Sequence, residues 1–317
     1  MALPHATTTP PAVREPTAQA PPGPTGKTRR GAGVRAPWWF VIPALAVYLF
    51  IVVVPSANGA LSSFTDWNGL RPVWSFVGLD NYAAVFSDRT ARDALVNTLL
   101  LAAAATVAQN LVGLLLALGV NSVVRSRYVL RVIFFAPVVL TPLVAGYVWS
   151  FLLSPSGAVN DALRTVGLGA LAHDWLGDPD TALYAIVAEI VWQFSGYSMV
   201  IYLAGLQAIP AEVLEAATID GAGAWSKFRR VVLPLLNGAV VINVMLCLIG
   251  GLKQFDQVMA MTGGGPGTAT ETISTAIYKS AFLLGDFPFS IALAVVMTVV
   301  IAVLAAVQFR LTQRKTS

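Results

Sequence analysis

Six long apolar stretches alternate with shorter polar segments along this chain. A bilayer core about 30 Å thick needs roughly 20 mainly apolar residues per helix. Lipid offers the backbone no hydrogen-bond partners, and the alternating pattern of a membrane barrel is absent, so these stretches are expected to be helices. The sequence therefore predicts an all-α membrane protein with six transmembrane helices, at about Trp38–Ser56, Ala94–Val120, Val129–Leu153, Leu183–Leu206, Val232–Leu252 and Phe287–Phe309.

Prolines and glycines modify this pattern at a few places. Pro137 and Pro142 fall inside the third apolar stretch, where they predict kinks. The loop between the third and fourth stretches is expected to hold one short amphipathic helix. The segment "TGGGPG", residues 262–267, is expected to be a flexible turn.

The first 36 residues differ from the rest in composition. They are rich in Pro, Ala, Thr and Gly and too poor in large apolar groups to bury a core. A disordered N-terminal arm is therefore expected over 1–36, followed by one transmembrane domain over 37–317.

Charge supports the membrane assignment and sets an orientation. Only 11% of the residues are charged, against about 25% in ordinary globular domains. With the N-terminus inside, the inner segments hold 14 of the 20 Lys and Arg residues, whereas the outer segments hold 11 of the 16 acids. This bias predicts a multi-pass plasma (inner) membrane protein with both termini cytoplasmic, and it explains the basic net charge without a nucleic-acid partner.

The sequence carries no recognisable set of catalytic residues. It has no Ser-His-Asp arrangement, and His173 has no second His or Cys nearby for a metal site. The single Cys247 excludes an internal disulfide. Glu189 is the one acid deep in an apolar stretch, and it keeps open the alternative of an ion-coupled secondary transporter, which would need such intramembrane groups.

The polar segment "LQAIPAEVLEAATIDGAGAWSKFRRVVLP" between the fourth and fifth stretches predicts a helix, a sharp turn and a second short helix. Gly221 and Gly223 permit backbone angles that other residues resist, so the chain can reverse there. Trp225 and Phe228, three positions apart, share one face of the second helix. Pro234 is expected to end this helix where the fifth span begins. By local physics alone, an amphipathic hairpin lying on the membrane surface is one interpretation of this segment.

The same segment also resembles the EAA motif of permease subunits in binding-protein-dependent ABC importers. The residues in register are Glu215, Ala216, Ala217, Asp220, Gly221, Ala222, Phe228, Leu233 and Pro234. Further segments, "FVGLDNY" (76–82), "FFAPVVLTPLVAGYVW" (134–149) and "MTGGGPGTATETISTAIYKSAF", are similar to the sugar-permease branch of that family, which serves maltose, other oligosaccharides and glycerol-3-phosphate. The resemblance extends from about Trp38 to the C-terminus.

This resemblance implies a function and a set of partners. The EAA segment would form coupling helices that seat in a cleft of a cytoplasmic ATPase. One such segment per chain implies a heterodimer with a second-type permease subunit, two copies of the ATPase and an extracytoplasmic solute-binding protein. ATP and Mg would be bound by the ATPase, so this chain would need no cofactor and would have no catalytic residue of its own. Its ligands would be a sugar or polyol and membrane lipid.

The resemblance also indicates a substrate pathway between the fourth and fifth spans. Residues at helical spacing on each span would face it, and they are similar in position to those lining the maltose site in the family: Gln193, Phe194 and Tyr197 on one span, and Cys247, Gly250, Gly251 and Gln254 on the other. Glycines and a cysteine replace several of the polar groups found there. The alternative is that both faces are helix–helix packing surfaces, where small residues and buried amides are common.

Overall fold

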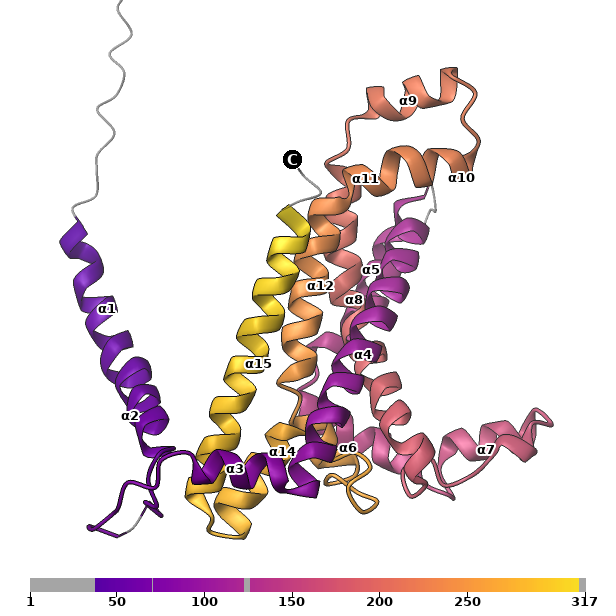
Figure 1. The fold of residues 1–317 in the computed structure, drawn as a ribbon. Helices are drawn as coiled ribbons and strands as arrows, with labels where there is room; N and C mark the ends of the chain where they lie inside the picture. The colour runs from indigo at the N-terminus through magenta and orange to yellow at the C-terminus, as the bar shows by residue number, and fades with distance from the viewer. Residues whose placement is uncertain (1–37, 70, 123–125, 314–317) are drawn as a thin grey trace, which may run out of the picture. The chain divides into compact units, whose positions relative to one another are not determined.

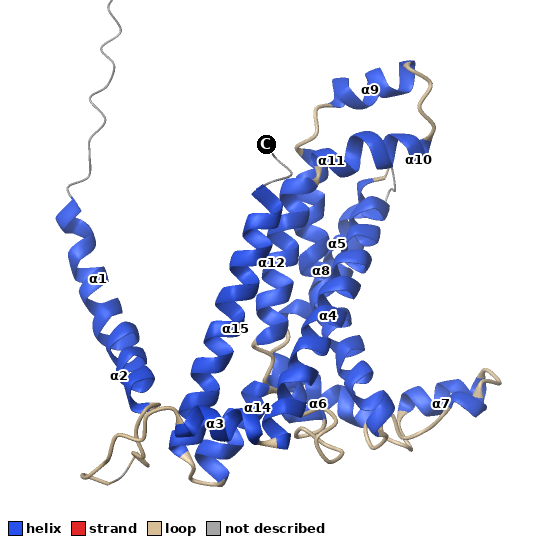
Figure 2. Ribbon diagram, in the orientation of Figure 1, coloured by secondary structure: helices blue, strands red, loops and turns tan. Residues whose placement is uncertain are grey.

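The computed structural model describes residues 38–69, 71–122 and 126–313; the arm expected over 1–36 lies outside these residues. The chain divides into two units at Val52. The first contributes η1 (Trp38–Val41), α1 (Ile42–Tyr48) and the start of η2 (Leu49–Val53). The second unit, from Val53 onward, holds the rest of the fold. Its described part consists of helices joined by loops and turns (Figure 2), and an isolated antiparallel bridge pairs Thr65 with Phe76.

Among the described residues, four continuous helices are long and apolar enough to cross a membrane. They are Trp39–Ser62, α4 (Arg89–Asn121), α8 (Pro179–Gln207) and Phe287–Arg310, the last within α15 (Phe287–Gln313). Two bent helix pairs bring the number to six if each pair counts as one span. The predicted class, an all-α membrane protein, is confirmed. The third span, in which kinks were expected, is a bent pair, and the other bent pair joins the run Ala224–Leu235 to α12 (Asn237–Leu252).

Proline chemistry explains the break in the third span. α5 (Arg127–Phe135) and η3 (Ala136–Val139) are separated from α6 (Pro142–Leu152) by a bend of 97°. Leu140 and Thr141 have extended backbones at the break, and the residue before a proline is driven out of the helical region by the pyrrolidine ring. The kink predicted from Pro137 and Pro142 is therefore present as a bend of about a right angle.

The fifth span also breaks, but not at Pro234. The helical run Ala224–Leu235 continues through Pro234 and meets α12 (Asn237–Leu252) at a bend of 68°. Pro234 lies inside this run, in α11 (Leu233–Leu235), directly after the π-helical turn η5 (Phe228–Val232). The expectation that Pro234 ends the helix is thus corrected: the change of direction comes at Leu236.

Close helix packing holds the centre of the second unit together. α8 packs along α4, and α12 packs against α4 as well. A Cβ added at Gly113 of α4 would lie 2.4 Å from the Ser198 Cβ of α8, and one at Gly251 of α12 would lie 2.8 Å from the Ala102 Cα of α4. Small residues allow the helix backbones to approach this closely, as is usual between helices in membranes.

Several short helices gather at the end of the second unit opposite α9 (Ala211–Ile219), α10 (Ala224–Lys227) and α11 (Figure 1). They include α3 (Asp80–Ser87), α7 (Ala158–Thr165), α13 (Asp256–Met261), α14 (Ile273–Tyr278) and η6 (Lys279–Leu283). α7 is the short helix predicted in its loop. An apolar cluster that includes Val85, Ala94, Ile273 and Leu293 joins α3, α4, α14 and α15.

The "TGGGPG" segment lies at this end and is held by hydrogen bonds. The Thr270 hydroxyl donates to the Gly265 carbonyl at 2.7 Å and lies 2.7 Å from the Thr262 hydroxyl. Asn97 of α4 donates to the carbonyls of Thr268 and Glu271, at 2.8 and 3.1 Å. The expected flexible turn is instead a loop anchored to a membrane-spanning helix.

Candidate functional site

The segment between α8 and α12 forms a hairpin at one end of the bundle (Figure 1). Its first arm is α9 (Ala211–Ile219), and its second is the run of α10 (Ala224–Lys227), η5 (Phe228–Val232) and α11. At the turn the Ala222 N–H bonds to the Ala217 carbonyl at 3.0 Å, and the Gly221 N–H bonds to Thr218 at 3.0 Å. This pair of bonds is a Schellman cap, which requires a left-handed residue, and Gly221 supplies it with φ of 75°.

Only one of the two glycines expected at this turn uses its conformational freedom. Gly223 has φ of −64° and precedes α10 as an ordinary extended residue. The hairpin is closed further by the Lys227 ammonium, which donates to the Thr218 hydroxyl at 2.5 Å. The predicted order of helix, turn and helix is present, with Gly221 alone as the reversing residue.

The hairpin leaves its side chains uncovered. No residue from Ala211 to Leu235 is buried, and Ile219 and Trp225 are 86% and 71% exposed. The ring of Trp225 lies 5.8 Å from that of Phe228, as expected from their shared face. Exposed apolar groups surrounded by charges, here including Glu215 and Arg229, are typical of a surface that binds another protein.

A chain of amides links two of the predicted pathway residues inside the bundle. Gln193 of α8 is fully buried and donates to the Leu140 carbonyl at 2.9 Å. It accepts a hydrogen bond from Gln257 at 2.8 Å, and Gln257 in turn accepts one from Gln254. The structure thus brings Gln193 and Gln254 together through Gln257, a residue that the sequence analysis missed. Gln254 itself lies beyond the end of α12 at Leu252, and not on the fifth span as expected.

The other predicted pathway residues divide between exposed and packed positions. Tyr197 is 44% exposed and Gly250 is exposed, with no atom within 4 Å of a Cβ built on it. Phe194 is half-buried. Cys247 is buried, with its sulfur 3.7 Å from the Ser198 hydroxyl, and Gly251 fits against α4. At these last two positions the contacts are those of helix packing.

A second polar cluster joins three spans and was also missed. Asn110 of α4 accepts hydrogen bonds from the Tyr202 hydroxyl of α8 and from the Asn243 amide of α12, the latter at 3.0 Å. It donates to the Thr106 carbonyl at 2.7 Å. Amide side chains inside the second and fifth apolar stretches were the available signal, because such groups need partners within the protein.

Comparison with known proteins identifies the family. The model of the binding-protein-dependent transport system inner membrane component matches residues 109–317. The chain belongs to this family. It is 35% identical over 280 residues to the probable starch degradation products transport system permease protein AmyD of Thermoanaerobacterium thermosulfurigenes, covering 88% of this chain and 94% of the relative.

Two further comparisons agree with this. The chain is 32% identical to the trehalose/maltose transport system permease protein MalF of Thermococcus litoralis, over 82% of this chain and 88% of the relative. Its fold is similar to a chain of a bacterial ABC transporter involved in the import of the acidic polysaccharide alginate, with a TM-score of 0.77 and 23% identity, covering 88% of this chain and 95% of the other.

Family membership decides between the functional alternatives. Members are permease subunits of ABC transporters and not enzymes, and the permease has no cofactor of its own. The ion-coupled alternative is unsupported. Glu189, which prompted that alternative, is fully buried in α8, and both its carboxyl oxygens lack a hydrogen-bond partner. Among the described residues, no group of three or more His, Cys, Asp or Glu side chains is placed to hold a metal ion.

Proposed function

We propose that this protein is the first-type permease subunit of an ATP-driven importer and passes a sugar or related polyol through the membrane. Relatives named for transport of starch degradation products and of trehalose/maltose match it over most of their length. A solved structural neighbour is a bacterial alginate transporter in complex with an alginate pentasaccharide-bound periplasmic protein. These names favour a carbohydrate delivered by an extracytoplasmic binding protein.

The observation that carries the coupling role is the uncovered hairpin. Residues Glu215–Arg230 project from the bundle, with apolar and charged side chains available to a partner. The Schellman cap at Gly221 closes the turn between the two arms of the hairpin. We assign this surface to a cleft of the cytoplasmic ATPase, with Glu215, Ala216, Ala217, Asp220, Gly221, Ala222, Phe228 and Pro234 as the coupling residues. ATP and Mg would be bound by that ATPase.

The partners follow from the number of hairpins. An ATPase dimer offers two clefts and this chain supplies one hairpin, so a second-type permease subunit fills the other. The resulting complex holds one copy of each permease and two ATPases. ATP-driven uptake with this chain as the sole permease species would instead indicate a homodimer.

The orientation proposed for the chain places both termini in the cytoplasm of the plasma (inner) membrane. Lys and Arg are concentrated in the hairpin and the other segments assigned to that side. The C-terminal end of α15 lies at the same end of the second unit as the hairpin, which supports the assignment (Figure 1).

The substrate pathway is proposed to follow the faces of α8 and α12. Tyr197 and Gly250 are the exposed residues of this pathway. At one end of it, the hydrogen-bonded chain Gln193–Gln257–Gln254 holds the three side-chain amides in position. Tyrosine faces and amides set in an apolar wall suit the hydroxyl groups and apolar faces of a sugar. Phe194, Cys247 and Gly251 shape the wall beside them.

Reconstitution in vesicles tests this function. The two permeases, the ATPase and the binding protein are incorporated together, and uptake of a labelled maltooligosaccharide panel is measured with internal ATP or with an ion gradient. We expect uptake only with ATP and binding protein present. Uptake driven by the gradient without ATP would overturn the proposal.

A further inference from the structure

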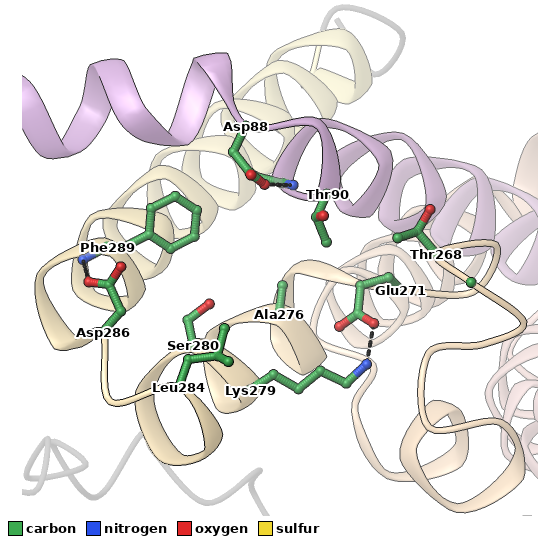
Figure 3. A pocket seen from close by; sticks show the side chains of 12 residues that line it. Asp88, Thr90, Thr268, Glu271, Ala276, Lys279, Ser280, Leu284, Asp286 and Phe289 are labelled. Carbon is green, nitrogen blue, oxygen red and sulfur yellow. Dashed lines mark hydrogen bonds and ion pairs between the residues drawn. The ribbon is translucent and has the colours of Figure 1, made fainter.

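A pocket lined by both charged and apolar side chains lies at the end of the second unit opposite the hairpin. Its volume is about 390 Å³, and it is enclosed by the start of α4, the loop before α14, η6 and the start of α15 (Figure 3). The side chains that matter for its chemistry are Asp88, Glu271, Lys279, Asp286 and Phe289. The sequence analysis assigned no role to this site.

Glu271 is the unusual group in this pocket. It is 2% exposed, and one carboxylate oxygen, Oε2, accepts a hydrogen bond from the Lys279 ammonium. The other oxygen, Oε1, is buried without a hydrogen-bond partner. Figure 3 shows it turned toward the interior of the pocket. A carboxylate oxygen buried without a partner is costly, so Glu271 gains from a hydrogen-bond donor that reaches this oxygen.

The charges around Glu271 favour a cation as that donor. Asp88 caps α4 through Oδ1, which accepts from the Ala91 N–H at 2.7 Å, and Asp286 accepts from the Phe289 N–H at 3.2 Å. The pocket lining therefore holds three carboxylates and one ammonium. Among the described residues, these carboxylates do not form a group placed to hold a metal ion, so a side-chain cation is the expected occupant.

The acceptor is held in place by its surroundings. Gly264 has φ of 91°, and a Cβ built on it would lie 2.1 Å from Glu271 Oε2 and 2.7 Å from the Lys279 Nζ, so the loop backbone rests directly on the ion pair. Asn97 binds the Glu271 carbonyl at 3.1 Å. A pre-positioned acceptor binds its partner with less loss of conformational freedom.

We infer that this pocket receives a lysine or arginine side chain of the extracytoplasmic solute-binding protein. The inference rests on the proposed function, because it requires the end opposite the coupling hairpin to face outward. That end carries 11 of the 16 acids of the chain. Phe289 offers an aromatic surface for the apolar stem or the cationic head of such a side chain. Complementary charge speeds encounter and fixes the register of a docked protein.

The test measures how much binding protein is needed to stimulate the reconstituted complex. Glu271→Gln and the double variant Asp88→Asn with Asp286→Asn remove charge while keeping size and, at the two caps, the accepting oxygen. We expect the half-saturating concentration of binding protein to rise roughly tenfold for Glu271→Gln and two- to fivefold for the double variant. Raising the salt concentration should reduce the difference from wild type.

Asp178→Asn is the matched control. Asp178 also caps a membrane-spanning helix, α8, by accepting from the Asp180 N–H at 2.9 Å, and it does not line the pocket. We expect wild-type half-saturation for this variant. Yield and gel-filtration profile of each complex, measured beforehand, show whether a variant has failed to assemble; if Glu271→Gln fails, the double variant carries the test.

Three outcomes would overturn the inference. One is unchanged half-saturation in both pocket variants while wild type transports normally. Another is a raised requirement for solute with an unchanged requirement for binding protein, which would assign the pocket to sugar hydroxyls. The third is an effect that appears only in vesicles containing ethanolamine lipids, which would assign it to a headgroup. Absence of ATP-driven uptake in the wild-type complex would contradict the proposed function. That result can be told apart from a failure of the pocket inference, which would appear only in the pocket variants.

Discussion

The hairpin over 209–236 and the loop over 253–286 are both polar, glycine-containing connections at the ends of membrane-spanning helices, yet they fold in opposite ways. The hairpin has no buried residue between Ala211 and Leu235. The loop buries polar side chains, among them Gln257, Thr270 and Glu271. One connection therefore leaves its side chains exposed, and the other is part of the protein interior.

The difference lies in what the neighbouring spans provide. α4 carries Asn97 and Thr98 beside the loop, and the Thr98 hydroxyl accepts from the Ile273 N–H at 2.9 Å. These groups satisfy backbone atoms that would otherwise be buried without partners. The hairpin instead satisfies its backbone within its own cap and helices. Polar composition alone thus does not distinguish an exposed connection from a buried one. The difference depends on whether other segments supply hydrogen-bond partners for its backbone.

The largest expected effect comes from Gly264 in the buried loop. Gly264→Ala places a methyl group against Glu271 and Lys279 at a backbone angle that alanine disfavours. We expect a loss of about 3 kcal/mol in the free energy of unfolding. Thermal unfolding of the detergent-solubilised complex, followed by gel filtration, measures it. Gly263→Ala, also at positive φ but with open space around its Cβ, is the control and should lose less; equal losses would show that contact with the ion pair is unimportant.

The next effect is the loss of the anchor on α4. Asn97→Ala removes the donor to the Thr268 and Glu271 carbonyls, which should cost about 2 kcal/mol. The same unfolding assay applies, with Asn58→Ala on an exposed position of α2 (Val54–Ser62) as control. Faster deuterium exchange confined to 262–272 is expected in the variant. Unchanged exchange there would contradict the anchoring role.

We expect a substitution in the hairpin to reduce transport more than it reduces the stability of the protein. Gly221→Val forces valine into φ of 75° and should cost only about 1–2 kcal/mol because no atom lies within 4 Å of the new Cβ. We expect ATP hydrolysis to continue while transport is lost. Gly223→Val is the matched control, since Gly223 has an ordinary φ and equally open surroundings. Normal transport in Gly221→Val would remove the coupling assignment.

The smallest effect is expected along the substrate pathway. Tyr197→Phe combined with Gln254→Ala removes one hydroxyl and one amide, each worth about 1 kcal/mol of binding. Uptake kinetics over a sugar panel should show a several-fold change in KM or in preference, with assembly intact. Tyr184→Phe changes an exposed tyrosine elsewhere on α8 and should leave kinetics unchanged. Unchanged selectivity in the double variant would refute the site.

The sequence predicted the features that depend on local chemistry. Apolar length identified the spans, and the glycines of "IDGAG" predicted the turn that Gly221 makes. Pro137 and Pro142 predicted a kink, because proline restricts its own backbone angles and those of the preceding residue in any tertiary context. The bend at Leu236 could not be predicted, since it depends on how α11 and α12 pack.

Contacts between distant segments were the features that the sequence did not indicate. Gln193 and Gln257 are 64 positions apart, and Asn110 and Asn243 are 133 apart. Each residue alone is compatible with packing, a ligand site or a lipid-facing position. Glu271 and Lys279 are closer in sequence, but the orphaned oxygen of Glu271 becomes evident only once the loop is seen folded against α4.

The bend at Leu236 has a mechanical consequence. The helical run Ala224–Leu235 is about 18 Å long by the α-helical rise. It ends at Leu236, which is 1% exposed and packed in the cluster with Ala117 and Tyr202. We expect this run to act as a lever arm with its fulcrum at Leu236, so that a displacement at Trp225 is delivered to α12 as a rotation. Spin labels on Ser226 and Ile242 would report it as a change in separation on ATP binding. Leu236→Ala, which loosens the fulcrum, should reduce that change, and an equal change in both proteins would exclude a pivot at this residue.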